Sequence, residues 1–88
     1  MPGKKYLAII SILVKDRQTY SAEVQNILSK NGHLILARLG VNPERSCIEK
    51  CSGLMAVAVA GTRQEINNLV KRLDSLYGIV AKVNIMTK

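Results

Sequence analysis

Two cysteines, Cys47 and Cys51, are the residues whose type and spacing point most directly to chemistry. They form a C-x3-C pattern in the polar segment 42–52, so two thiolates could supply half of a tetrahedral zinc or iron site. A structural zinc site has four ligands, and His33 is the one histidine in the chain. Two such segments from two subunits would together supply four sulfurs. A reversible disulfide and two reduced thiols without a role are the alternatives, and we expect reduced thiols.

Other side chains give no support to catalysis. Ser11 lies within an apolar stretch with no base nearby, and the sequence contains neither Gly-x-Ser-x-Gly nor a glycine-rich phosphate loop. The carboxylates are scattered, and Asp16 and Glu65 are placed to serve as helix-start groups. The sequence therefore predicts a non-enzymatic protein with no catalytic residues.

The chain is strongly basic, with a net charge of +7 over 88 residues. Its cations occur in ones and twos, which favours a solvated basic surface over a dedicated polyanion site. RNA binding by a sheet usually needs aromatic side chains on its central strands, and here only Tyr6 meets that need. A basic nucleic-acid-binding module remains as the alternative function.

The amino-terminal region resembles a secretory signal, because Lys4 and Lys5 precede the apolar stretch 6–14. The resemblance fails at residues 15–17, where Lys-Asp-Arg stands in place of a small-residue cleavage site. No apolar run approaches the roughly 20 residues that a membrane-spanning helix needs. We expect a cytoplasmic protein with no membrane partner.

Apolar periodicity and helix signals divide the chain into six elements. Thr62 and Glu65 have the spacing of a capping box, in which each side chain accepts a hydrogen bond from the backbone of the other residue. Asp16 is the expected N-cap of an earlier helix, which Asn31-Gly32 is expected to end in the left-handed conformation, and Gly78 ends the later helix. The expected strands cover residues 6–14, 33–41, 54–60 and 79–86.

The order strand, helix, strand, strand, helix, strand predicts an α+β, ferredoxin-like fold for residues 1–88 as one domain. A shift of 46 positions aligns Gly32 with Gly78 and Val24 with Val70, which supports two related halves. Right-handed crossovers place both helices on one face of a four-stranded antiparallel sheet, with the first and third strands in the centre.

The first and third strands are apolar on both faces, yet two helices can cover only one face. An uncovered apolar face is larger than a soluble monomer usually tolerates, so we expect a homo-oligomer, a dimer or a tetramer, that covers it. The alternative is that small side chains at Ala56, Ala58 and Ala60 keep the outer face shallow. The pattern leaves open whether these residues or Met55, Val57 and Val59 meet the partner.

Arg38 is a charge inside the apolar stretch 34–40. On an edge strand it can face water, where a charge discourages unwanted strand pairing. Alternatively, it lines a groove between subunits and pairs with an anion or with a carboxylate of the partner.

Three stretches of the sequence resemble one known family. They are Val14-Lys15-Asp16-Arg17, Arg38-Leu39-Gly40 and the helix-to-strand passage 73–83. With the element order, they make the chain similar to the family of regulators of the iron-only hydrogenase system. The resemblance covers nearly the whole chain.

The resemblance implies an ACT-like domain, related in fold to the C-terminal domain of the nickel-responsive regulator but without its DNA-binding arm. It implies a role in transcriptional regulation, with a small-molecule or metal effector, or a protein partner. Such domains assemble through their sheets and bind effectors near the turn after the first strand. Lys15, Asp16, Arg17 and Arg38 match that region, whereas the cysteine-bearing segment 43–51 departs from the family pattern.

Overall fold

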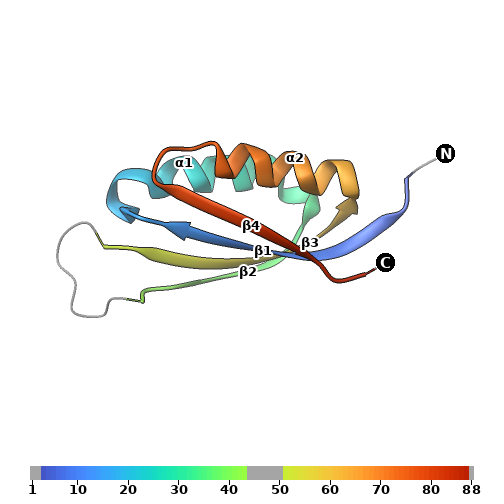
Figure 1. The fold of residues 1–88 in the computed structure, drawn as a ribbon, viewed down its shortest axis with the longest axis horizontal. Helices are drawn as coiled ribbons and strands as arrows, with labels where there is room; N and C mark the ends of the chain where they lie inside the picture. The colour runs from blue at the N-terminus through green and yellow to red at the C-terminus, as the bar shows by residue number, and fades with distance from the viewer. Residues whose placement is uncertain (1–2, 44–50, 88) are drawn as a thin grey trace.

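The computed structural model describes residues 3–43 and 51–87, and within them one antiparallel sheet of four strands carries two α-helices on one face (Figure 1). The elements, in chain order, are β1 (Lys5–Val14), α1 (Arg17–Lys30), a short 3-10 helix (Gly32–Leu34), β2 (Ile35–Val41), β3 (Gly53–Thr62), α2 (Arg63–Asp74) and β4 (Ile79–Ile85). No helix in these two ranges is long and apolar enough to cross a membrane.

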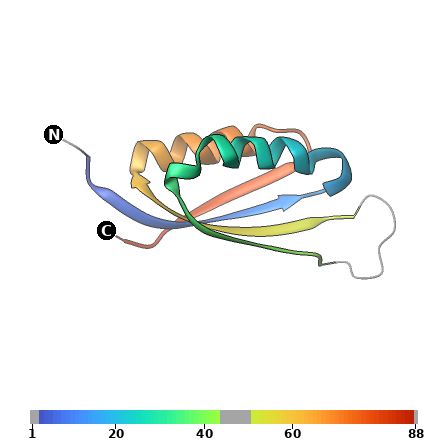
Figure 2. The same ribbon diagram turned by 180° about the vertical axis from the view of Figure 1, so that it is seen from behind.

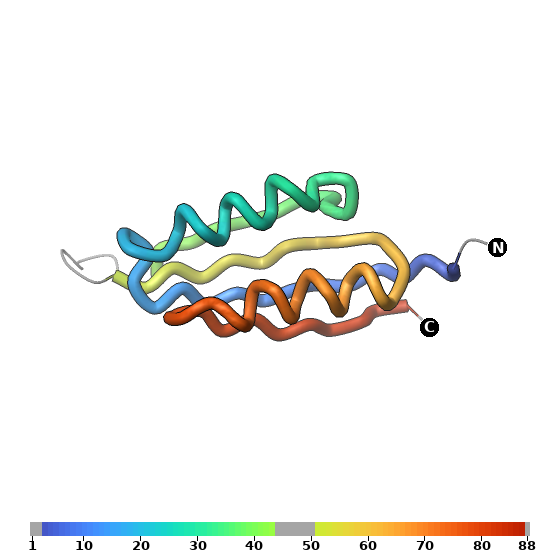
Figure 3. The backbone as a smooth tube through the Cα atoms, turned by 90° about the horizontal axis from the view of Figure 1, so that it is seen from above, coloured from blue at the N-terminus to red at the C-terminus, as the bar shows by residue number. Residues whose placement is uncertain are grey.

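The strand order β2-β3-β1-β4 confirms the expected ferredoxin-like topology, with the first and third strands in the centre. β1 pairs antiparallel with β3 from Lys5 opposite Thr62 to Val14 opposite Gly53. The two helices lie side by side over the sheet (Figure 3), and the view from behind shows that the other face of the sheet has no helix over it (Figure 2).

Alternate residues of the central strands point toward the helices and form the core. Val57 and Val59 of β3 are fully buried there, opposite Ile10 and Ala8 of β1. From the helices, the buried residues are Val24, Leu28, Ile66, Leu69 and Leu73. The structure thus shows which residues of β3 face the helices. Leu54, Ala56, Ala58 and Ala60 alternate with the buried ones and therefore lie on the helix-free side.

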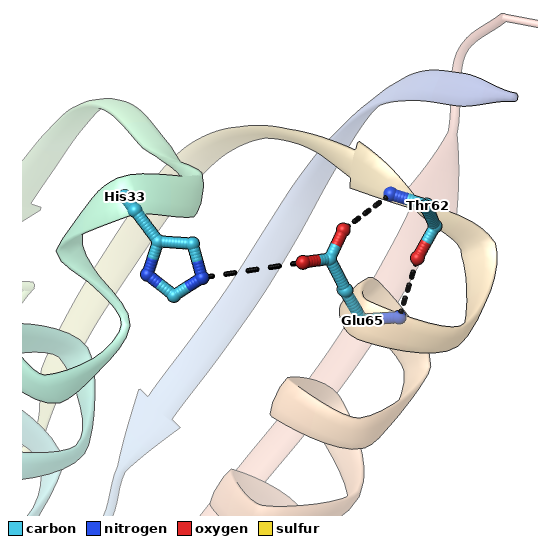
Figure 4. A network of polar contacts seen from close by, with 3 residues as sticks. All are labelled: His33, Thr62 and Glu65. Carbon is cyan, nitrogen blue, oxygen red and sulfur yellow. Dashed lines mark hydrogen bonds and ion pairs between the residues drawn. The ribbon is translucent and has the colours of Figure 1, made fainter. Parts of the chain in front are cut away.

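The passage from β3 into α2 has no loop, because the predicted capping box forms. The backbone N–H of Glu65 donates to Oγ1 of Thr62 over 3.1 Å, and the N–H of Thr62 donates to Oε1 of Glu65 over 2.9 Å (Figure 4). Two donors that a helix start leaves unpaired are satisfied in this way.

The passage from α1 to β2 differs from the expectation of a strand over residues 33–41. Residues Gly32–Leu34 form a 3-10 turn, and β2 begins only at Ile35. Asn31 has φ −114°, so the helix does not end in the expected left-handed conformation. Instead, Nδ2 of Asn31 donates to the carbonyl of Ile27 over 2.8 Å, which satisfies an end-of-helix acceptor.

Gly78 ends the segment after α2 in the left-handed region, with φ +78°. Its position also leaves no room for a side chain, because a Cβ there would lie 2.6 Å from Cε2 of Tyr20. The N–H of Lys15 donates to the carbonyl of Gly78 over 2.8 Å, so this turn is bonded to the turn after β1.

We predict that Gly78→Ala destabilises the protein by about 2 kcal/mol, because it adds left-handed strain and a contact with the Tyr20 ring. Gly32→Ala is the matched control, since no atom lies within 4 Å of its Cβ position. Urea denaturation of both variants measures the effect, and equal stabilities of the two variants would contradict the explanation.

Candidate functional site

A cavity of about 310 Å³ lies beside the turn after β1, where the resemblance places an effector. We call it the effector cavity. Its charged lining residue is Arg17, its other polar ones are Ser21 and Asn42, and the rest are Val14, Gly40, Val41, Gly53, Leu54 and Met55. The cavity therefore combines an apolar wall with one guanidinium group, one hydroxyl group and one amide group.

Arg17 is held by the start of β3. Its backbone N–H donates to the carbonyl of Cys51 over 2.9 Å, and its side chain passes over Gly53, where a Cβ would lie 3.5 Å from Cβ of Arg17. This is an ordinary van der Waals distance, so the arginine stem packs directly against the start of the strand.

Asp16 is the N-cap of α1, but its carboxylate does not bond to the helix backbone. Oδ2 of Asp16 accepts from the hydroxyl of Thr19 over 2.9 Å, and its backbone carbonyl accepts from the N–H groups of Thr19 and Tyr20. Lys15, Asp16 and Arg17 are consecutive, so the structure keeps these three expected ligand-binding residues at one turn.

Arg38 is separated from that turn. It is an exposed residue of the edge strand β2 and pairs in register with Val57. It lines two hollows of about 230 Å³ and 210 Å³, one with Ala37 and Leu39 and one with Leu28 and Ser29, whereas the residues that line the effector cavity do not include it. Within one chain, the four expected ligand-binding residues do not form a single site.

The helix-free side of the sheet presents mainly aliphatic side chains, and we call it the open face. The strand register assigns to it Leu7, Ile9, Ser11 and Leu13 of β1, Leu54, Ala56, Ala58 and Ala60 of β3, Ala37, Leu39 and Val41 of β2, and Val80, Lys82 and Asn84 of β4. Leu39 is 66% exposed and Leu7 is 48% exposed. The polar members, Ser11, Lys82 and Asn84, gather on β1 and β4, so the apolar part lies over β1, β3 and β2.

The effector cavity and the open face share residues. Val41, Leu54 and Met55 line the effector cavity and also a hollow of about 220 Å³ beside Ser11, Leu39 and Ala56. Binding in the cavity therefore reaches side chains that a molecule covering the open face would touch.

Cys51 is buried, with 1% exposure, and its sulfur is disulfide-bonded, so the expectation of a reduced thiol is wrong for Cys51. Cys47 lies outside the described residues. A cysteine binds zinc as a thiolate, so the metal interpretation of Cys47 and Cys51 requires the reduced protein. In the described ranges, no three residues of the His, Cys, Asp and Glu types are grouped as a metal would need.

A second polar site, which the sequence analysis did not find, lies between the end of α1 and the start of α2. Nε2 of His33 approaches Oε2 of Glu65 to 4.0 Å (Figure 4). The hydrogen bonds from Thr62 favour the carboxylate form and lower the pKa of Glu65, and the charge of His33 lowers it further. The residues are 32 positions apart, so no local pattern relates them.

We predict that Glu65 makes the protein more sensitive to acid. A carboxyl group whose pKa is lowered by folding contributes stability above its ordinary pKa, and this stability is lost as the pH falls through the lowered folded-state pKa. In Glu65→Gln the amide keeps the capping box but does not titrate. The advantage of the wild type over this variant in urea denaturation should shrink from pH 6 to pH 3, and a constant advantage would contradict it.

The fold places this protein in the class of ferredoxin-like, ACT-like domains. Residues 6–83 match the model of the TM1266-like family, whose description is "Iron-only hydrogenase system regulator, putative". Because the match covers well over half of the chain, the protein belongs to this family, and the resemblance drawn from the sequence is confirmed.

Solved structures support the same fold. The uncharacterized protein TM1266 from Thermotoga maritima has a TM-score of 0.83 and 23% identity, over 96% of this chain and 100% of that chain. The ACT domain from GTP pyrophosphokinase of Chlorobium tepidum has a TM-score of 0.69 and 14% identity, over 96% and 89%. CPII, a nitrogen regulatory PII-like protein from Thiomonas intermedia K12 bound to ADP, AMP and bicarbonate, has a TM-score of 0.56 and 14% identity, over 97% and 98%. No curated protein matches the chain in sequence.

Proposed function

We propose that this protein is a non-enzymatic, cytoplasmic regulatory module of the iron-only hydrogenase system, formed by residues 1–88 as one ACT-like domain. It works as a homo-oligomer that forms through the open face, and it senses a small effector in the adjacent cavity. Family membership supports the regulatory role. The observation that carries the proposal is the uncovered, aliphatic face of the sheet.

A second copy of the chain is the occupant that suits the open face. Strands of 7 to 10 residues, four abreast, give a face of about 28 Å by about 19 Å, or roughly 500 Å² per copy. Two copies would then bury about 1,000 Å² in total, which is about the least area expected of a biological interface. A face-to-face pair also places each aliphatic patch against an identical one, as two-fold symmetry requires.

The described strands place no aromatic side chain on the open face, which disfavours the nucleic-acid alternative. Tyr6, the one tyrosine of β1, has the strand parity of Ala8 and Ile10 and therefore points to the helix side. Two cations lie over the Tyr6 ring, because Nζ of Lys4 and Cζ of Arg63 are each 5.3 Å from the ring centroid. A base could stack on this ring only after displacing these cations.

The effector cavity suits a small anion with an apolar body. Val14, Val41 and Leu54 supply the apolar wall, and Arg17 supplies a guanidinium group for a carboxylate or phosphate. The structural neighbour CPII was solved with ADP, AMP and bicarbonate bound, which supports an anionic effector in this fold. Since the cavity shares residues with the open face, effector binding and assembly are thermodynamically linked.

We predict that Leu39→Lys shifts the protein toward monomer, because it places a charge within the apolar patch at a side chain that is 66% exposed. Tyr77→Lys is the control, since Tyr77 is 83% exposed and lies between α2 and β4, away from the open face. Sedimentation of the wild type at micromolar concentration should show a dimer or larger species that Tyr77→Lys retains. A monomeric wild type would remove the basis of the proposal.

We predict that hexanoate, which pairs a carboxylate with a short apolar chain, raises the melting temperature and binds more tightly than hexanol. Replacing Arg17 with Gln should weaken its binding about tenfold, the loss of one charge-assisted hydrogen bond. Lys15→Gln changes the net charge equally but alters a residue that does not line the cavity. Calorimetry measures the constants, and equal losses in the two variants would assign the effect to general charge.

A further inference from the structure

A second cavity of about 220 Å³ lies at the carboxyl end of α1, about 21 Å along that helix from Arg17. We call it the polar cavity. Its α2 residues, Glu65, Asn68, Leu69 and Arg72, occupy one helix face at positions i, i+3, i+4 and i+7, and they meet Asn31, His33 and Leu34. The cavity thus joins a charged helix face to the 3-10 turn after α1.

Glu65 is held in place at one end of the polar cavity. Its Oε1 accepts from the backbone of Thr62, so its Oε2 is directed to the His33 side (Figure 4). Gly61 lies directly beneath, where a Cβ would come within 2.8 Å of Cδ2 of Leu34 and 3.2 Å of Oε1 of Glu65. The backbone therefore sets the position of a negative charge before any ligand arrives.

Arg72 places a positive charge at the other end. Seven residues separate it from Glu65, a rise of about 10 Å along α2. Among the described residues, the ion pair formed by Glu65 is with His33 and not with Arg72. Asn68 lies between the two charges, and Leu34 and Leu69, which are 5% and 3% exposed, form an apolar floor.

Asn31 adds an acceptor on the opposite wall. Its Nδ2 donates to the carbonyl of Ile27 over 2.8 Å, and this bond orients the amide. The amide oxygen has acceptor capacity remaining for an ammonium group beside the Glu65 carboxylate.

From this arrangement we propose that the polar cavity binds a small zwitterion, its ammonium group at Glu65 and Asn31 and its carboxylate at Arg72. A simple anion would be repelled by Glu65, and a simple cation would be repelled by Arg72. A molecule with both charges meets a partner at each end. The volume is below the roughly 300 Å³ typical of sites for drug-sized ligands, which favours a metabolite of few atoms.

The proposal is independent of the assembly and effector proposals. The polar cavity lies on the helix side of the sheet and shares no lining residue with the effector cavity. Binding here is therefore expected whether the protein is a monomer or an oligomer.

Calorimetry with glycine and 4-aminobutyrate, whose charges are near together and farther apart, tests the proposal, with acetate and methylammonium as single-charge probes. We expect at least one zwitterion to bind with a dissociation constant of about 1 mM or lower, and each single-charge probe to bind at least about tenfold more weakly. The amide shifts of Asn31 and Asn68 in NMR spectra locate the binding.

Glu65→Gln and Arg72→Gln should each weaken zwitterion binding about tenfold, since each removes one charge partner. Glu65→Gln keeps a side chain that can complete the capping box, so the fold is retained. Lys71→Gln is the matched control, because Lys71 neighbours Arg72 but does not line the cavity. The proposal is overturned if neither zwitterion binds saturably, if acetate binds as tightly as the zwitterions, or if both variants bind like Lys71→Gln.

Discussion

One constraint governs this molecule: a four-stranded sheet has two faces, and the described helices cover only one. The central strands bury Ile10, Ile12, Val57 and Val59 beneath α1 and α2. Their alternate residues are also aliphatic, so the same strands that build the core also build an open face that favours association. A polar surface on that side would need no cover, whereas this aliphatic surface is the feature on which the proposed assembly depends.

A second interaction connects the sheet to its helical cover. The capping box of Thr62 and Glu65 starts α2 directly at the end of β3, without a connecting loop. This abrupt junction fixes the helix relative to the strand, and it also fixes a carboxylate at the edge of the helix layer. A local device for starting a helix therefore provides the charged end of the polar cavity.

The two cavities lie at opposite ends of α1 and differ in character. The effector cavity is mainly apolar with one arginine, and it adjoins the open face through Val41 and Leu54. The polar cavity has charges of both signs and lies on the helix side. If both proposals hold, this layout gives the domain one site that is coupled to assembly and one that is not. Membership of the TM1266-like family is consistent with such a role.

The sequence by itself determined the element order and the capping box, because each depends on residues within a few positions of one another. It placed the end of the later helix at Gly78, whereas α2 ends at Asp74 and Gly78 belongs to the turn before β4. The sequence also determined that Lys15, Asp16 and Arg17 lie at one turn, since they are consecutive. The 3-10 turn at Gly32–Leu34 was missed because the apolar pattern of the following strand continues back into it.

Only the tertiary structure decided how distant residues meet. The register of β2 on β3 places Arg38 opposite Val57, and Arg38 does not line the effector cavity. The packing of the α1 carboxyl end against α2 brings His33 to Glu65 and creates the polar cavity. The packing of the helices also buries Val57 and Val59 in the core, and it leaves Leu54 and every second residue of β3 after it on the open face. A period of two defines two faces of a strand, but only the side on which the helices pack decides which face is buried.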